Sequence, residues 1–205
     1  MSQDYHLEEL EIALDPNHPA HILPPPLPYS QKVLDIGCGA GQTLIARYAD
    51  RVSFGVDVDM EALKLGRSLT DRVHFVCGKA EALPFANGQL DMVIARVSLP
   101  LTNISTALEE SHRVLKKGGQ VWMTLHPFSA PWRRAKTSHW KGRIFFGYIV
   151  LNSLLFHLVQ KQFSFLGRYE SFQTERGISR ALRQNGFDTI SITQGKFFLV
   201  TARAR

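Results

Sequence analysis

Short apolar runs alternate with amphipathic segments along most of the chain. The runs are rich in Val, Ile, Leu and Phe and are flanked by glycine or polar residues, a pattern typical of buried strands. The segments between them carry apolar residues at helical spacing, and Asp59 and Thr174 are good N-caps. The alternation predicts strands at 32–36, 52–57, 72–77, 90–97, 120–126, 188–194 and 196–204, and helices at 6–14, 42–50, 60–69, 104–117 and 174–186.

Strands that alternate with helices favour a parallel sheet covered on both faces. The turn at 194–196 is tight enough for a hairpin, so we expect the last strand to run antiparallel. The predicted fold class is α/β: a doubly wound, seven-stranded, mostly parallel sheet with an antiparallel last strand and a helical insertion after strand five. We expect one domain over 1–205, made of an N-terminal helix and Pro-rich arm (1–31), a cofactor-binding core (32–126), an insertion (127–170), and a C-terminal helix and hairpin (171–205).

Composition excludes several classes of protein. The chain has 205 residues, of which 44% are hydrophobic, so it is long enough to bury a core and too apolar to be disordered. Two cysteines can support neither a disulfide framework nor a Cys/His zinc spacing, and we predict no metal site. The N-terminus is acidic and lacks an apolar h-region, so we expect no signal peptide and a cytoplasmic location.

Basic residues are concentrated in the C-terminal part of the chain. Residues 1–126 contain 11 Lys and Arg against 15 Asp and Glu, whereas residues 127–205 contain 13 against 3. An anionic partner is therefore expected to meet the C-terminal part. RNA is one such partner, but the basic residues form no recognisable RNA-binding module, so nucleic acid is the less favoured choice.

The sequence VLDIGCGAGQ, at 33–42, carries the strongest functional signal. A buried strand runs directly into Gly37, Gly39 and Gly41, and a helix follows. Glycines let the backbone turn sharply and approach a ligand closely, and the helix N-terminus offers unpaired N–H groups. This pattern is typical of the first strand–helix turn of a nucleotide-binding α/β sheet.

Asp57 ends the second predicted strand, about 20 residues beyond the first glycine of this loop. A carboxylate at that position can accept hydrogen bonds from both ribose hydroxyls of a nucleotide. The alternative is that Asp57 caps the following helix, but Asp59 already suits that role. We therefore predict that Asp57 is a ribose ligand.

Four sequence blocks follow one another along the chain: VLDIGCGAG (33–41), GVDVD (55–59), GKAEALPFANGQLDMVIAR (78–96) and ALEESHRVLKKGGQVWMTL (107–125). In this order and at these separations they resemble the class I S-adenosylmethionine-dependent methyltransferases. The similarity is greatest to the type 11 branch that includes the ubiquinone and menaquinone C-methylating enzymes. It runs from about Lys32 to His126, with a weaker match from Tyr169 onward. It implies a Rossmann-like methyltransferase fold, S-adenosylmethionine as cofactor and S-adenosylhomocysteine as product.

The resemblance implies roles for the positions that match the family. The glycine loop would pass beneath the methionine part and the ribose of the cofactor, and Asp57 would hold the ribose. Asp35 would orient the loop and reach the cofactor's amino group, while Arg96 would line the methionine and substrate side. Cys38 lies within the loop, and we expect its side chain to be a small buried residue rather than a nucleophile. The predicted loop positions are Gly37, Cys38, Gly39 and Gly41.

The adenine side contains one departure from the family pattern. Val58 and Leu83 would sandwich the ring, and Ala80 would offer its backbone N–H. The family commonly has an acid where this chain has Lys79, and lysine has no acceptor for the exocyclic amine. Glu81 could replace the missing acid if the loop is extended. The alternatives are a weaker affinity for the cofactor, a different contact to the adenine, or a protein that resembles the family but does not catalyse methyl transfer.

His126 ends the fifth predicted strand, on the edge where ligands bind in such sheets, and Ser98 follows the fourth. We name His126 as the candidate catalytic residue, contacting the acceptor or acting as its base; alternatively it simply opens the loop before Pro127. A carbon or phenol-type acceptor would need such a base. After strand four the chain reads ARVSLPLTN, which lacks the NPPY-like run of enzymes that methylate amino nitrogens.

Substrate identity is expected to lie in the insertion, 127–170. It begins basic and tryptophan-bearing and continues with the apolar run Ile144–Val159, which is short for a membrane span at 16 residues. A lid over a hydrophobic pocket, a homodimer contact, or peripheral membrane contact through 132–159 would each use such a helix. We therefore expect methyl transfer to a small apolar or anionic acceptor; the alternatives are an RNA methyltransferase and a cofactor-binding protein without turnover.

Overall fold

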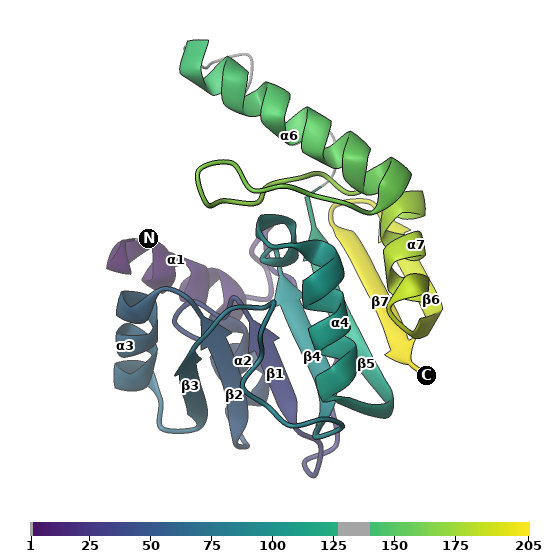
Figure 1. The fold of residues 1–205 in the computed structure, drawn as a ribbon. Coiled ribbons are helices and arrows are strands. Elements are labelled where there is room, and N and C mark those ends of the chain that lie inside the picture. The colour runs from purple at the N-terminus through teal and green to yellow at the C-terminus, as the bar shows by residue number, and fades with distance from the viewer. Residues whose placement is uncertain (1, 127–139) are drawn as a thin grey trace.

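The structure, a computed structural model, describes residues 2–126 and 140–205. One sheet of seven strands has the order β3-β2-β1-β4-β5-β7-β6 (Figure 1). All neighbouring strands are parallel except β7, which runs antiparallel to both β5 and β6. The predicted fold class is therefore confirmed. The strands are β1 (Val33–Ile36), β2 (Ser53–Asp57), β3 (Val73–Cys77), β4 (Leu90–Arg96), β5 (Leu115–Leu125), β6 (Phe187–Gln194) and β7 (Phe198–Ala204).

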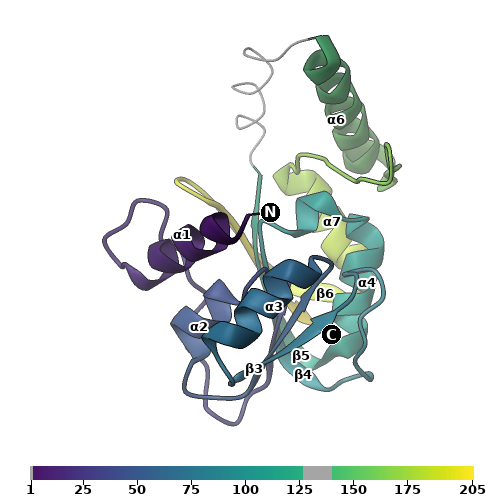
Figure 2. The ribbon, with the colours of Figure 1, turned by 90° about the vertical axis from the view of Figure 1, so that its left-hand side faces the viewer.

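Helices cover both faces of the sheet. Helices α2 and α3 pack on one face through a core that includes Leu44, Leu63 and Phe75, and α1 lies against them. Helices α4 and α7 cover the other face (Figure 2). The helices are α1 (Gln3–Leu14), α2 (Gln42–Tyr48), α3 (Met60–Leu69), α4 (Ile104–Val114), α6 (Trp140–Val159) and α7 (Glu175–Gln184), with a 3₁₀ turn η1 (Leu99–Leu101).

The predicted boundary between the fourth helix and the fifth strand was wrong. The helix was expected to continue to Lys117, but α4 ends at Val114 and β5 begins at Leu115, which pairs with Leu90. The register then shifts, and pairing resumes at Gln120 after Gly118 takes a φ of +77°. Leucine is a good helix former, so the pairing of Leu115 with Leu90 overrides the local preference.

The predicted Pro-rich arm is extended and fastened to the first layer of helices. The hydroxyl of Tyr48 donates to the carbonyl of Pro25 at 2.7 Å, and Arg51 donates to that of Pro28 at 2.6 Å. Ile22 packs on the core of this face. These contacts satisfy carbonyls that proline-rich backbone cannot pair in a ladder.

Helix α6 and the segment at 160–173 lie beyond the edge of the sheet where the parallel strands end (Figure 1). The helix begins at Trp140, before the expected Ile144. The basic first part of the predicted insertion, 127–139, lies outside the described residues.

Two helical glycines provide a matched test of the packing. A Cβ on Gly66 of α3 would lie 2.5 Å from the Phe75 ring and 2.9 Å from the carbonyl of Ala40, whereas a Cβ on Gly147 of α6 would meet nothing within 4 Å. We expect Gly66→Ala to lower the free energy of unfolding by about 1–3 kcal/mol through overpacking. Gly147→Ala should raise it by about 0.5–1 kcal/mol, because glycine is entropically costly in a helix. Urea unfolding of both variants measures the difference, and equal effects would contradict the close approach of α3 to the sheet.

Candidate functional site

The strand order reverses beside β1, which lies between β2 and β4. The chain passes from β1 to β2 on one side, whereas the connection from β3 crosses to β4 on the other side. Ligands of open α/β sheets bind outside the strand ends at such a point. The carboxyl ends bring together the residues after β1, Asp57 of β2 and Arg96 of β4. The structure thus places the predicted methionine and ribose residues along one edge.

Three glycines of the loop after β1 have left-handed backbone conformations. The φ angles of Gly37, Gly39 and Gly41 are +70°, +55° and +84°. A Cβ on Gly37 would overlap the Cβ of Ser98, and one on Gly39 would lie 3.0 Å from Nδ1 of His6. Both conformation and space therefore require glycine here.

Asp57 fastens this loop to the neighbouring strand. Its Oδ2 accepts from the N–H of Gly39 and its Oδ1 accepts from the N–H of Asp59, each at 2.8 Å. The cap of α3 is Asp59, whose carboxylate accepts from Glu61 and Ala62. The alternative of Asp57 as the helix cap is therefore wrong, and its remaining lone pairs stay available to a ligand.

Asp35 is a buried carboxyl beneath the loop. Its Oδ1 has no hydrogen-bond partner. Burial raises the pKa of Asp35 to about 7, the positive charge of Arg96 lowers it, and the nearby carboxylate of Asp57 raises it. A buried, unpartnered carboxyl oxygen costs free energy unless a donor reaches it, so this atom suits a cationic ligand group.

Cys38 behaves as the sequence predicts. Its side chain is buried, and this burial raises the pKa of the thiol well above its usual value. A Cβ on Gly55 would lie only 2.7 Å from its Sγ, so the thiol fills space between the loop and β2. The side chain has the character of a small core residue rather than a nucleophile.

The residues predicted to hold adenine have unequal environments. Val58 is 66% exposed just after β2, and Lys79 is exposed just after β3. Ala80 and Leu83 are buried and belong to the main core. Glu81 accepts from the N–H of Asn103 at 2.8 Å, at the N-terminus of α4. Because this carboxylate already faces α4, the structure does not favour it as the replacement for the acid missing at position 79.

Helix α1 brings two residues to the site that sequence reasoning missed. His6 is buried against Gly39, with its Nδ1 3.0 Å from Nε2 of Gln42 and its Nε2 without a partner. Glu9 forms an ion pair with Arg96. The signal in the sequence was weak: a histidine and an acid three residues apart share one face of the helix.

Arg113 of α4 is a second residue whose role was missed. Its guanidinium donates to the carbonyls of Leu83 and Phe85, at 2.9 and 2.7 Å, and pairs with Glu110. The N–H of Leu83 donates to the same glutamate at 2.7 Å. This network fixes the loop that follows β3, next to the predicted adenine positions.

The ends of β4 and β5 lie side by side at this edge, where the acceptor is predicted to bind. Val97 has a φ of +60°, an unusual conformation for a β-branched residue and one that concentrates at functional sites. Ser98 donates to the carbonyl of Ile36 at 2.5 Å and so ties this turn to β1. His126 follows β5, directly beside β4 in the sheet, and its role as a base stays a prediction.

Residues 34–123 match the model of a family described as "Methyltransferase domain". This part of the chain is therefore a methyltransferase domain of the class I, S-adenosylmethionine-dependent kind. The predicted family is thereby confirmed, together with the cofactor that this family uses.

Individual relatives match only part of this chain. A demethylmenaquinone methyltransferase of Renibacterium salmoninarum is 35% identical over 119 residues, which are 53% of this chain and 48% of the relative. A malonyl-(acyl-carrier protein) O-methyltransferase of Methylovorus sp. is 36% identical over 121 residues, 52% of this chain and 41% of the relative. The chain thus spans about half the length of the curated relatives it matches.

A similarity in fold extends further than the similarity in sequence. The crystal structure of the YcgJ protein from Bacillus subtilis has a TM-score of 0.60 at 17% identity, and the match covers 98% of this chain and 99% of that protein. At that identity the likeness concerns the fold alone, and it agrees with the methyltransferase topology described above.

The described residues fit S-adenosylmethionine. Gly37 and Gly39 hold the left-handed turn that a loop passing beneath a cofactor needs, and the unpartnered oxygen of Asp35 suits the cofactor's amino group. Asp57 keeps acceptor capacity for the ribose. These residues would hold a methyltransferase cofactor at the turn after β1.

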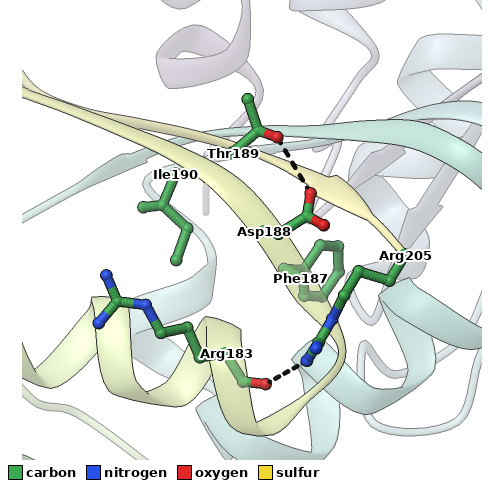
Figure 3. Close-up of a pocket in the computed structure, with 6 residues that line it drawn as sticks. All are labelled: Arg183, Phe187, Asp188, Thr189, Ile190 and Arg205. Atoms are coloured by element: carbon green, nitrogen blue, oxygen red, sulfur yellow. Dashed lines mark hydrogen bonds between the residues drawn. The ribbon is translucent and has the colours of Figure 1, made fainter.

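A separate hollow lies at the opposite edge of the sheet. It measures about 310 Å³ and is formed where β6 begins and β7 ends (Figure 3). Arg205 donates to the carbonyl of Arg183 there, at 3.1 Å. None of the predicted methyltransferase residues lines it, and it lacks the glycine loop of the other edge. Its lining is Arg183, Phe187, Asp188, Thr189, Ile190 and Arg205.

Asp57→Ala tests the ribose contact. We expect S-adenosylmethionine affinity to fall by about 1.5–3 kcal/mol, because hydrogen bonds to a charged group are lost and the loop is released from β2. Calorimetric titration measures the change. The matched control is Asp59→Ala, which should cost about 1 kcal/mol of stability through loss of the helix cap while leaving cofactor affinity near the original. Unchanged affinity in Asp57→Ala would mean that other residues hold the ribose.

The raised pKa of Asp35 predicts a pH dependence of cofactor binding. The ionised carboxylate is the form that binds a cationic amino group, so affinity should rise by about tenfold between about pH 6 and about pH 8. The free protein should show the opposite trend: its stability should fall as pH rises from the ordinary value of 3.8 to about 7, because ionisation is costly only in the folded state. Calorimetry on Asp35→Asn, which should keep only the cofactor's own titration, is the control. A wild-type curve identical to that of Asp35→Asn would contradict the contact.

Proposed function

We propose that this methyltransferase transfers a methyl group to a small acceptor that is apolar or anionic. The observation that carries the proposal is the ion pair between Arg96 and Glu9 at the carboxyl edge of β4. A cation at this edge already binds a carboxylate from the chain itself. An acceptor with a carboxylate or similar anionic group could take the place of Glu9.

The apolar character of the acceptor is supported by the residues around this cation. Val97 is exposed next to Arg96, whereas Leu99 and Pro100, which follow in the 3₁₀ turn η1, are buried. The N–H of Ser171 donates to the carbonyl of Pro100 at 3.2 Å, so this turn is tied to the segment at 160–173, which carries exposed Phe163 and Phe165. The apolar part of an acceptor would therefore contact Val97 beside Arg96.

When bound, the cofactor supplies an electrophilic methyl group on a sulfonium. The chain's part is to hold and orient the acceptor in line with that methyl group and to exclude water. Helix α1 covers the glycine loop through His6, and Glu9 fixes the guanidinium of Arg96. His126 is the residue proposed to take a proton from an acceptor that must lose one.

Two relatives support a metabolite acceptor. One is named a demethylmenaquinone methyltransferase and the other a malonyl-(acyl-carrier protein) O-methyltransferase. The alternatives remain an RNA methyltransferase, motivated by the basic C-terminal part, and a cofactor-binding protein without turnover, motivated by Lys79. A steep fall of RNA affinity with salt would support the first alternative, because phosphate contacts release counterions.

A methyl-transfer screen with mass detection tests the proposal. We expect the protein and S-adenosylmethionine to methylate a component of a lipid and metabolite extract and to form S-adenosylhomocysteine. Gly39→Val is the inactive control, because a branched side chain would press on His6 and Gln42 and would strain the left-handed backbone of the loop. At saturating cofactor, Arg96→Gln should then lower turnover of anionic acceptors by about tenfold or more relative to turnover of uncharged ones. Cofactor binding without any methylated product would contradict the proposal and favour a binding protein.

A further inference from the structure

Helix α6 presents an uncharged apolar face to solvent. Ile144, Gly147, Leu151, Leu154 and Leu158 follow one another at alternating spacings of three and four residues, so they share one side of the helix. Leu151 is 50% exposed and Leu158 is 63% exposed. Within α6, the window Gly142–Val159 has a mean hydropathy of 1.5, is long and apolar enough to cross a membrane, and is 28% buried. A contiguous apolar face of this kind marks an interaction surface.

The opposite face of α6 is bonded to the rest of the protein. The hydroxyl of Tyr148 donates to the carbonyl of Arg168 at 2.8 Å, and Asn152 donates to that of Glu170 at 3.1 Å. Ser153 accepts from the N–H of Phe172 at 2.7 Å, and His157 lies 2.7 Å from the hydroxyl of Thr174. A membrane-spanning position would break these bonds and leave their groups unpaired in lipid. The helix is therefore held with its apolar side outward and its polar side on the protein.

A second exposed apolar element lies next to α6. Phe165 and Arg168 close a tight turn by two hydrogen bonds between their backbone groups. The ring centroids of Phe165 and Tyr148 are 5.3 Å apart. Leu166 at the tip of this turn is 88% exposed and has a φ of +51°. A leucine in a left-handed conformation is strained, and one so exposed gains nothing from the fold in return.

Cations lie at both ends of the apolar face. Arg143 is exposed in the first turn of α6, and Lys161 is exposed just beyond its last turn. Arg180 of α7 donates to the carbonyl of Leu158 at 2.9 Å, so a third cation lies at the C-terminal end. A second copy of the chain packed on this face would bring like charges together at the helix ends in either orientation. An anionic lipid surface instead matches both the apolar face and the charges.

We propose that the outward face of α6 docks on an anionic membrane surface, with the helix parallel to the bilayer plane. Leu151, Leu154 and Leu158 enter the boundary between headgroups and acyl chains, while Arg143 and Lys161 contact the phosphates. Docking of this kind needs neither cofactor nor acceptor, so it does not depend on the proposed reaction.

Sedimentation with lipid vesicles tests the docking. We expect the protein to bind vesicles of phosphatidylglycerol and phosphatidylcholine in equal parts, and to bind pure phosphatidylcholine more weakly. The double variant Leu151→Ser with Leu154→Ser should lower the partition coefficient by about tenfold or more, because two apolar side chains that would be buried in the bilayer are replaced by polar ones. Arg143→Gln with Lys161→Gln should lower it by about fivefold per residue at low salt.

The matched control replaces exposed leucines elsewhere. Leu14→Ser with Leu69→Ser, in α1 and α3, should leave vesicle binding unchanged, and melting curves check that each variant is folded. Absence of binding to the anionic vesicles would overturn the proposal. Binding that the α6 variant does not weaken would also overturn it. So would a wild-type dimer that the α6 variant converts to a monomer, since the face would then be an interface between copies.

Discussion

The hydrogen bond from the N–H of Gly39 to the carboxylate of Asp57 is the contact on which the site depends. It joins the loop after β1 to the end of β2, and the N–H groups of Gly37 and Cys38 reinforce it by donating to the carbonyl of Val56. The loop so fixed begins α2 at Gln42 and supports α1 through His6. One strand end thereby positions two helices as well as the carboxylate of Asp57, which is the predicted ribose ligand.

The charges of the site favour a cationic ligand. Among the described residues, Arg96 lowers the pKa of Asp35 and pairs with Glu9, while Asp57 is near enough to Asp35 to raise that pKa. The acids outnumber the cation, and burial keeps Asp35 partly protonated at neutral pH. A ligand that brings a sulfonium and an amino group relieves this imbalance, whereas an anionic acceptor must compete with Glu9 for Arg96.

Most features that were predicted correctly from the sequence depend on residues that are close together in the chain. The glycine loop, the cap at Asp59 and Asp57 at the end of β2 each depend on residues close in the chain, so pattern and family resemblance were sufficient. The pairing of Glu9 with Arg96 joins residues 87 positions apart. It depends on how α1 packs on α2 and α3, which no local pattern specifies. The end of α4 was mispredicted for the same reason, because a pairing with β4 decided it.

Helix α6 shows why an apolar pattern alone left a lid, a dimer contact and a membrane surface open. Its few polar residues, Asn152, Ser153 and His157, point to the protein and bond to the segment at 160–174. Most soluble helices place polar residues toward water and apolar ones toward the core. In α6 the polar groups gain more from the irregular backbone, whose donors and acceptors need partners. The apolar side of α6 consequently faces outward. Exposing this surface to water is unfavourable, and contact with another apolar surface would offset that free-energy cost.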